Sequence, residues 1–299
     1  MHFALTLVSP DPEAVDAARS LVEQAVAGLG AHVKETRYLG LNCLDKHIEG
    51  SDAISLRKAA EAAIADLPVD VCVQPQAGRR KRLLVADMDS TIIGCECLDE
   101  LADFAGKKAE IAAITERAMR GELAFEGALR ERVGMLKGLE TGALQRCYDE
   151  RVRLNPGART LVETMTAGGA RCVLVSGGFE FFTGRVARAA GFGRHRANRL
   201  LEDHGRLTGM VAEPILGREA KLEALNAEAQ SLGLALADTL AIGDGANDLA
   251  MIEAAGLGVA YRAKPIVAQQ ADARIDHSDL TALLYFQGYA AEEFIAAAG

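Results

Sequence analysis

One short apolar run constrains the fold of this chain more than any other segment. It covers Leu83 to Ala86 and is followed at once by two aspartates, Asp87 and Asp89. Because alternate residues of a strand point to the same side, both carboxylates can face a crevice at the carboxyl end of a buried parallel strand. The alternative is a strand end whose Asp89, Ser90 or Thr91 caps the next helix. The run therefore predicts a β-strand and leaves two roles open for the aspartates.

A second segment of the same design, residues 238–251, runs from an apolar stretch into acidic residues and then a helical pattern. Two acidic strand ends favour a divalent metal. Carboxylate and carbonyl oxygens suit Mg²⁺, which keeps several waters and binds together with a substrate phosphate. Gly243 and Gly245 permit a tight turn that side chains would obstruct. A calcium loop or a plain turn is the alternative, although the acidic residue that closes an EF-hand loop is missing.

Two further features favour an anion as the ligand. Cys172 to Val175 is a third apolar run, and it leads into the segment Ser176 to Gly178 just before a predicted helix. Such a turn exposes backbone N–H groups to an anion. Lys221 lies early in a helix predicted over residues 219–229, where its ammonium could neutralise phosphate charge. The alternative for Lys221 is a solvated surface lysine.

Taken in order, DxDST, SGG, the lysine and GDGxND resemble the motifs of the haloacid dehalogenase (HAD) superfamily, and the resemblance covers roughly residues 81–290. Within that superfamily the chain is similar to the bacterial phosphoserine phosphatases that have an amino-terminal extension. The resemblance implies that Asp87 is the nucleophile and that Asp89 is the general acid and base. It also implies a Mg²⁺ ion bound by Asp87, by Asp244 and by the main-chain carbonyl of Asp89.

The chemistry of a phosphate monoester agrees with these roles. The ester is doubly negative near neutral pH, and two unit charges about 4 Å apart repel by about 4 kcal/mol at an effective dielectric constant of about 20. Mg²⁺ and Lys221 would offset this repulsion, while the Ser176 hydroxyl and the Gly177 N–H hold the phosphoryl oxygens. Asp89 would protonate the departing oxygen and then deprotonate the attacking water. Asn247 is expected to support the phosphate and the metal.

Strands and helices alternate after residue 83, which predicts a doubly wound α/β core with the chemical motifs at the carboxyl ends of parallel strands. Residues 94–154 interrupt this alternation. Their apolar positions recur at helical spacing, so we expect a helical cap, inserted after the first motif, that closes over the crevice. Met119 and Phe125 are candidate apolar residues of the cap over the site, with core packing as the alternative. Residues 198–211 predict a hairpin.

The resemblance also assigns the substrate's amino-acid portion to two residues of the cap. Glu96, within GCEC, and Arg132, within LRERVGMLKG, match positions that contact this portion in phosphoserine phosphatases. A guanidinium can bind a carboxylate bidentately, and a glutamate can pair with the ammonium of a zwitterion. From the residues alone, the alternative is that Arg130, Glu131 and Arg132 form a solvated helix face.

The implied activity is the Mg²⁺-dependent hydrolysis of O-phosphoserine to serine and phosphate through an aspartyl-phosphate, the last step of serine biosynthesis. A phosphotransferase or a phosphatase for another small phosphoester is the first alternative. The second is an amino-acid-binding regulatory protein with an inert HAD domain. The intact set of Asp87, Asp89, Lys221 and Asp244 disfavours that second alternative.

Residues 1–76 predict a βαββαβ order that resembles an ACT-like ferredoxin fold, in which the valines of residues 69–73 form an edge or half-buried strand. ACT domains often bind amino acids between protomers, so this resemblance implies L-serine as a candidate effector and a homodimer as the assembly. A domain that only stabilises the chain is the alternative. Residues 77–82 follow as a linker, whose basic run from Arg79 to Arg82 is expected to be solvated rather than a localisation signal. Residues 83–299 would then form the HAD domain.

Composition narrows the class of protein. A net charge of −9 argues against a general nucleic-acid binder, and no apolar stretch is long enough to cross a bilayer. The first apolar run, Phe3 to Val8, lacks a basic leader and is unlike a signal peptide. The six cysteines are scattered, and the C-x-C pair of Cys95 and Cys97 has no second cluster, so small buried side chains are favoured over a soft-metal site. These features predict a cytoplasmic protein.

Overall fold

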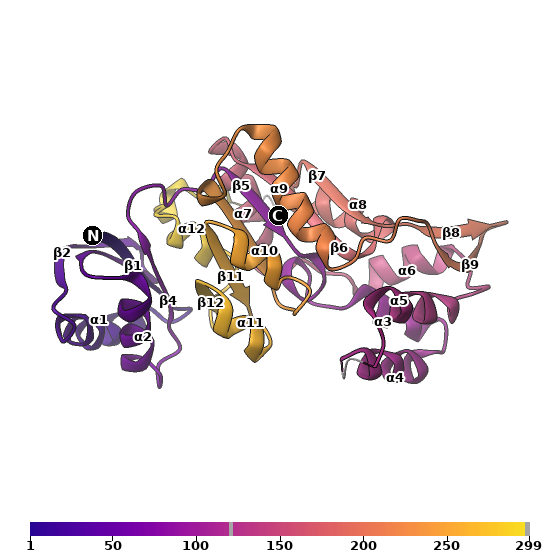
Figure 1. The fold of residues 1–299 in the computed structure, drawn as a ribbon, viewed down its shortest axis with the longest axis horizontal. Helices are drawn as coiled ribbons and strands as arrows, with labels where there is room; N and C mark the ends of the chain where they lie inside the picture. Colours follow the sequence, from indigo (N-terminus) through magenta and orange to yellow (C-terminus); the bar gives the residue numbers. More distant parts are fainter. Residues whose placement is uncertain (120–121, 297–299) are drawn as a thin grey trace.

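The computed structural model describes residues 1–119 and 122–296, apart from the side chains of Glu116, Ala118 and Met119, so the predicted position of Met119 over the site lies outside the described residues. At the centre is a sheet of six parallel strands in the order β12-β11-β10-β5-β6-β7 (Figure 1). These strands are β5 (Leu83–Ala86), β6 (Arg171–Phe179), β7 (Arg194–Asn198), β10 (Thr239–Gly243), β11 (Leu257–Tyr261) and β12 (Ala273–Ile275). The predicted doubly wound α/β core is confirmed.

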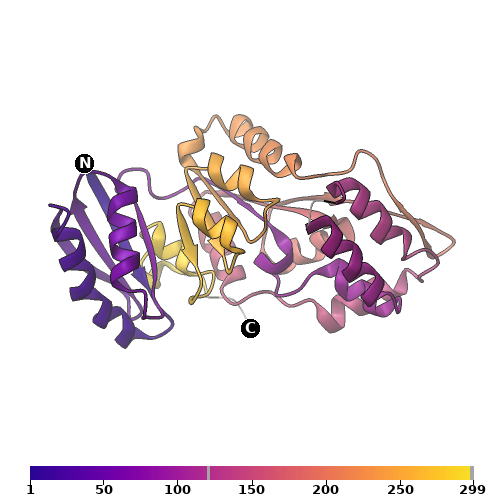
Figure 2. The same ribbon diagram turned by 60° about the horizontal axis from the view of Figure 1, so that its bottom comes forward.

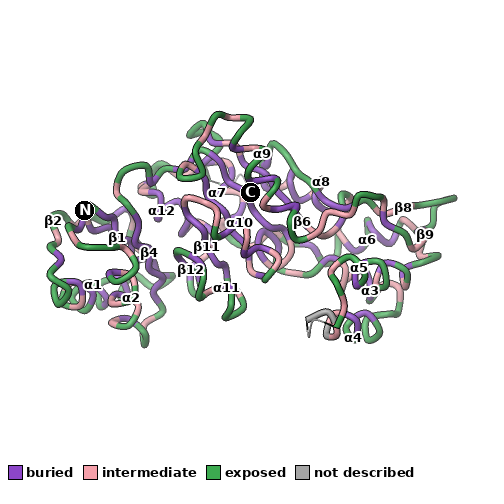
Figure 3. Tube along the Cα trace, viewed as in Figure 1, coloured by how far each residue is buried: buried purple, intermediate pink, exposed green. Residues whose placement is uncertain are grey.

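Helices cover both faces of this sheet, because its inner strands are apolar at consecutive rather than alternate positions. In β5, Leu83 and Val85 join one cluster of buried side chains, and Leu84 and Ala86 join another on the opposite face. The first face packs on α9 (Glu219–Leu232), α10 (Leu249–Ala254) and α11 (Pro265–Gln270), and the second on α7 (Ala158–Ala167), α8 (Glu180–Ala190) and α12 (Ala282–Phe286). The inner strands β5, β10 and β11 are buried at every position, and Figure 3 shows the buried chain running through the middle of this region.

The order of the strands places a crevice next to β5. The chain fills the sheet outward from β5 in two directions, with β6 and β7 on one side and β10, β11 and β12 on the other. In a doubly wound sheet such a reversal opens a crevice at the carboxyl ends of the two central strands. Those strands are β5 and β10, which end at Ala86 and Gly243, directly before the two acidic segments.

The insertion after the first motif is helical, as predicted. We call it the cap: α3 (Cys97–Phe104), α4 (Lys108–Met119), α5 (Phe125–Gly134) and α6 (Gly142–Arg151). A bridge between Ile93 and Leu154 joins the two ends of the insertion. The predicted hairpin is also present, as β8 (Leu200–Asp203) and β9 (Arg206–Val211), and β9 packs on α5. Within the part of the chain that the structure describes, no helix combines the length and the apolar character needed to cross a membrane.

The amino-terminal elements follow the predicted βαββαβ order. They are β1 (His2–Val8), α1 (Pro12–Ala27), β2 (His32–Gly40), β3 (Cys43–Glu49), α2 (Ala53–Ala63) and β4 (Asp70–Pro75). The strands form an antiparallel sheet in the order β2-β3-β1-β4, and α1 and α2 pack against one of its faces. This N-terminal sheet unit and the cap lie at opposite ends of the molecule, with the parallel sheet between them (Figures 1 and 2).

The second face of the N-terminal sheet is covered by the rest of the chain. Val8, Cys43 and Cys72 belong to the same buried cluster as α7 and α12, and β4 contacts β12. Strand β4 is therefore an edge strand by its hydrogen bonds, as predicted, but the prediction that it is half-buried is wrong. One of its faces meets α1 and α2 and the other meets the α/β core, which buries Gln74 as well as the valines.

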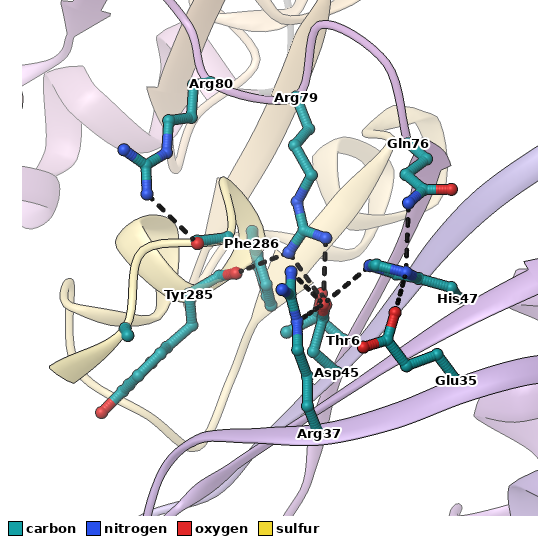
Figure 4. A network of polar contacts seen from close by, with 12 residues as sticks. Thr6, Glu35, Arg37, Asp45, His47, Gln76, Arg79, Arg80, Tyr285 and Phe286 are labelled. Carbon is teal, nitrogen blue, oxygen red and sulfur yellow. Dashed lines mark hydrogen bonds and ion pairs between the residues drawn. The ribbon is translucent and has the colours of Figure 1, made fainter.

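The basic run is the clearest correction to the sequence prediction. Arg79 and Lys81 are buried rather than solvated, whereas Arg80 and Arg82 are exposed. Arg79 donates two hydrogen bonds to the fully buried carboxylate of Asp45, at 2.8 and 3.1 Å, and a third to the Tyr285 carbonyl (Figure 4). A buried carboxylate requires a charged partner, and the linker supplies it. Periodicity could not reveal this pairing, because the partner lies on a distant strand.

Candidate active site

The side chains at the carboxyl ends of β5, β6 and β10 face a cavity of about 480 Å³ that the cap covers from the other side. Three of the four predicted motifs contribute residues to the lining of this cavity. The fourth, Lys221, does not line the cavity but contacts Asp87, which does. The lining of the cavity consists of Asp87, Asp89, Ser90, Glu96, Leu98, Asp99, Thr115, Phe125, Leu129, Arg132, Ser176, Gly177, Gly178, Phe179, Asp244, Gly245, Asn247 and Lys264. Predicted site residues therefore converge from positions separated by more than a hundred residues in sequence.

Lys221 is buried and lies between two carboxylates. Its ammonium is 2.5 Å from Asp87 Oδ1 and 2.5 Å from Asp248 Oδ1. Burial by itself would lower the pKa of Lys221, but Asp248 and Asp87 raise it above its ordinary value, so the lysine is a fixed positive charge. The alternative of a solvated surface lysine is wrong.

Three carboxylates gather at this point. Oxygens of Asp87, Asp244 and Asp248 lie within 4.8 Å of one another, and they are the one group of potential metal ligands found among the described residues. Burial and the Asp248 carboxylate raise the pKa of Asp87 well above its ordinary range, and the same two causes raise the pKa of Asp244 to about 6. Three carboxylates face one ammonium, so the cluster lacks positive charge, and its oxygen donors fit a hard divalent cation.

Asp248 is the main residue that the sequence prediction missed. Its Oδ2 accepts hydrogen bonds from the backbone N–H groups of Asp244 and Gly245, and this shapes the turn after β10. A side chain at Gly243 would collide with Asp248, and one at Gly245 would collide with Asn247, so the predicted need for glycines in this turn is confirmed. The available signal was the second acid of GDGxND, four residues after Asp244.

Asp89 also lines the cavity, and its carboxylate hydrogen-bonds to groups outside the acidic cluster. Its Oδ1 accepts the Cys97 N–H at 2.9 Å, at the start of α3, and its Oδ2 accepts the Ser176 hydroxyl at 3.2 Å. Asp89 therefore accepts the first N–H of α3, as the capping alternative predicted, and it also lines the cavity. Burial, with the Glu96 carboxylate next in importance, raises the pKa of Asp89 to about 7, which suits a group that gives and takes protons near neutral pH.

The Ser176 to Gly178 segment is not the predicted turn. Strand β6 continues through it to Phe179, with a break in its pairing to β7 between Val175 and Phe179. The Ser176 hydroxyl accepts the Gly178 N–H, and an added side chain at Gly178 would press on Asp89 and Ser176. A glycine avoids this crowding, since the segment passes close to the carboxylate of Asp89 after β5.

The cap contributes a cation and anions to the far side of the cavity. Arg132 on α5 is half-buried, and it donates to the Ala128 carbonyl at 3.2 Å and to the Thr115 hydroxyl at 3.4 Å. Burial lowers its pKa, whereas the nearby Asp99 and Glu96 carboxylates raise it. The predicted solvated face is correct for Arg130 and Glu131, which are exposed, but not for Arg132.

Glu96 lies at the edge of the cavity, where it accepts the Ser90 hydroxyl at 2.7 Å. Phe125 lines the cavity from the cap, close to both Gly177 and Gly217. Lys264 was missed because no motif surrounds it. Its backbone N–H donates to the Asp244 carbonyl, and its charge opposes the rise in the pKa of Asp244.

Comparisons with known proteins agree with this geometry. Residues 84–253 match the family model of haloacid dehalogenase-like hydrolases. A phosphoserine phosphatase from Polaromonas sp. is 47% identical over 208 residues, which cover 68% of this chain and 88% of the relative. A HAD family hydrolase from Salmonella enterica serovar Typhi superposes with a TM-score of 0.85 at 28% identity, covering 96% of this chain and 98% of that one.

A solved phospho-aspartyl intermediate analogue of phosphoserine phosphatase superposes with a TM-score of 0.65 at 38% identity, covering 69% of this chain and 99% of that one. The family-model match at residues 84–253 includes the carboxyl ends of β5, β6 and β10, which carry the acidic cluster and the serine. Sequence, fold and the residues around the cavity therefore agree that this chain belongs to the haloacid dehalogenase-like hydrolase family.

Proposed function

We propose that the protein is a phosphoserine phosphatase that hydrolyses O-phosphoserine to serine and phosphate. One observation carries the proposal: a single cavity joins the carboxylates of Asp87 and Asp89 on one side to Arg132 and Glu96 on the other. The first pair suits a phosphoryl group, and the second suits the two charges of an amino acid. The relatives named phosphoserine phosphatase support this choice of substrate.

In the first step a carboxylate oxygen of Asp87 attacks phosphorus, and the bond from phosphorus to the serine oxygen breaks. Asp89 gives its proton to that oxygen, which its pKa of about 7 permits near neutral pH. The Lys221 ammonium at Asp87 lowers the cost of bringing two anions together. The Ser176 hydroxyl and the Gly177 N–H would hold phosphoryl oxygens at the end of β6.

In the second step a water molecule attacks the phosphorus of the aspartyl-phosphate. Asp89, now ionised, takes a proton from the water, and the bond between phosphorus and the Asp87 oxygen breaks to release phosphate. The cap limits the entry of other water, since Phe125 and Leu129 line the cavity from α5.

We propose Mg²⁺ as the divalent cation of the acidic cluster. Asp87 and Asp244 would hold it with their carboxylates and Asp89 with its main-chain carbonyl, while Asp248 would hold the turn and Lys221 in place. Asn247, which lines the cavity beside Asp244, would support the phosphate. When bound, the cation supplies charge that offsets the repulsion between the substrate phosphate and the Asp87 carboxylate.

Phosphate release from L-phosphoserine, measured with Mg²⁺ and then with EDTA, tests the proposal. We expect turnover with the metal and loss of turnover with the chelator. A panel of small phosphoesters distinguishes the alternatives, because a phosphatase for another ester would prefer a different substrate and a phosphotransferase would be accelerated by an added alcohol acceptor. No turnover with any ester would favour the inert regulatory protein.

We also propose the division into residues 1–76, a linker at 77–82 and a catalytic domain at 83–299, with the first part as an ACT-like unit. Serine binding at that unit, a homodimer and a cytoplasmic location remain part of this proposal. Since the α/β core covers one face of the N-terminal sheet, titration with L-serine should use the whole chain. Absence of binding heat at millimolar serine would contradict the effector role.

A further inference from the structure

Asn198 is a buried polar residue outside the motifs that define the site. It is the last residue of β7, at the carboxyl end of the parallel sheet, and its exposed fraction is only 2%. Its backbone lies opposite Phe179 in the β6–β7 ladder, directly after the Ser176 to Gly178 segment. A buried amide needs hydrogen-bond partners, and the partners of this one lie on two segments that reach the active site.

The side-chain amide of Asn198 joins those two segments. Its Nδ2 donates to the Gly177 carbonyl at 2.8 Å and to the Leu216 carbonyl at 3.2 Å. Its Oδ1 accepts the Leu216 N–H at 2.7 Å. Two carbonyls and one N–H therefore surround a group that offers two donors and one acceptor in fixed positions.

Each of the joined segments carries part of the proposed phosphate site. Gly177 lies between Ser176, whose hydroxyl contacts Asp89, and Gly178, whose N–H contacts that hydroxyl. Leu216 precedes α9, and Lys221 on α9 contacts Asp87. Residues 212–218 form no helix or strand, although Ile215 packs on the core and Glu213 pairs with Arg130. The Asn198 amide is the group that joins Leu216 of this segment to Gly177 at the end of β6.

We infer that Asn198 is a positioning residue for phosphoryl transfer. Its side-chain amide sets the distance between the Ser176 to Gly178 segment and the segment that leads to Lys221. The inference rests on the proposed function. Asn198 is not among the residues that line the cavity, so it acts through the groups it holds. A displacement of those groups by a fraction of an ångström weakens contacts to the phosphoryl oxygens, and these contacts matter most in the transition state.

The test compares Asn198→Asp and Asn198→Ser with wild type. The aspartate has the same shape and still accepts the Leu216 N–H, but it places an oxygen against two carbonyls. The serine keeps one donor without adding charge. Asn226→Ala, at an exposed position on α9, is the matched control. The readouts are kcat and KM for phosphoserine, the inhibition constant of inorganic phosphate, and the folded fraction of each variant from circular dichroism and size-exclusion chromatography.

We expect Asn198→Asp to lower kcat per folded chain by about tenfold to a hundredfold and to weaken inhibition by phosphate by about tenfold, with KM changed much less. Asn198→Ser should lie between Asp and wild type. A residue that only stabilises the fold would reduce the folded fraction and leave kcat per folded chain and phosphate inhibition unchanged, which would overturn the inference. Failure of both variants to fold would also overturn it.

The outcomes separate this inference from the proposed function. If wild type does not hydrolyse phosphoserine, the proposed function is wrong. If wild type and Asn226→Ala are active and Asn198→Asp matches them in kcat and phosphate inhibition, the proposed function stands and the positioning role is wrong.

Discussion

The Asp87 carboxylate is held at a position where one oxygen contacts Lys221 while two other carboxylates lie within 4.8 Å. Such crowding of anions is costly unless a cation balances them, so the arrangement has little value as a stabilising feature. Under the proposed function, its value lies in placing Asp87, the proposed nucleophile, beside the charges that let it approach a phosphate. The predictions at this scale concern which side chain does which part of the chemistry.

Asp87→Asn should reduce kcat by about a thousandfold or more, because an amide oxygen is a poor nucleophile. Acid quenching of the reaction with ³²P-phosphoserine should give labelled wild-type protein and unlabelled variant. Label on the variant, or on another residue of the wild type, would exclude Asp87 as the nucleophile.

Arg132→Ala should lower kcat/KM for phosphoserine by about a hundredfold, because Arg132 is the proposed charged partner of the substrate carboxylate. The loss should be much smaller for phosphoethanolamine, which has no carboxylate. Arg130→Ala is the matched control, since Arg130 lies on the same helix but is exposed and pairs with Glu213. Equal losses on both substrates would contradict a carboxylate clamp.

At the scale of elements, the turn between β10 and α10 shows how a loop sets the geometry of a site. Asp248 accepts two backbone N–H groups of that turn with one oxygen and contacts Lys221 with the other. It therefore connects the shape of the turn, the position of the ammonium and the acidic cluster. Because positions 243 and 245 are glycines, no side chain there collides with Asp248 or Asn247, and the turn can close around the Asp248 carboxylate.

Asp248→Asn should raise the Mg²⁺ concentration for half-maximal activity by about tenfold or more, because groups that orient metal ligands contribute that much to affinity. A Mg²⁺ titration of phosphate release measures this. Glu253→Gln on the exposed side of α10 should leave the titration unchanged. An unchanged titration for Asp248→Asn would restrict Asp248 to a structural role.

At the scale of the whole molecule, the N-terminal sheet unit is built into the core rather than attached by a flexible tether. Asp70 accepts the backbone N–H groups of Asp276, His277 and Ser278 after β12. Gln74 donates to the Phe286 carbonyl on α12, and Asp45 pairs with Arg79 directly before β5 (Figure 4). We therefore expect the N-terminal unit and the α/β core to unfold together.

Arg79→Ala should destabilise the protein by about 3–5 kcal/mol, because it leaves the buried Asp45 carboxylate without its main partner. Urea unfolding followed by circular dichroism measures the change. Arg80→Ala, which removes an exposed pair with Glu293, should cost less than about 1 kcal/mol. Similar losses for the two variants would mean that the buried pair does not tie the unit to the core.

The same pair predicts a dependence of stability on pH. Burial by itself would raise the pKa of Asp45, but the Arg79 guanidinium and the Thr6 hydroxyl hold it below its ordinary value of 3.8. The stabilisation is therefore present above that value and is lost as the pH falls through the lower pKa of the folded state. Unfolding of Asp45→Asn between pH 3 and 7 should show a weaker acid dependence than wild type. An identical slope would contradict the pairing.

The sequence by itself determined the order of strands and helices, the glycine turn at 243 to 245 and the residues of four motifs, because these depend on local periodicity and on chemistry that few side chains provide. It also identified the cap and, among the residues that line that side of the cavity, Glu96, Phe125 and Arg132. These features follow from short segments, whose patterns are complete within a few residues of one another.

Tertiary structure alone decided what each buried charge contacts. Asp248, and also the uncharged Asn198, gained partners on other elements of the fold, and the basic run at 79–82 became partly buried because Asp45 on β3 pairs with Arg79. The strand through Ser176 to Gly178 stays extended because β7 pairs with its two ends. Such pairings depend on which elements pack together, and packing is a property of the whole fold rather than of any one segment.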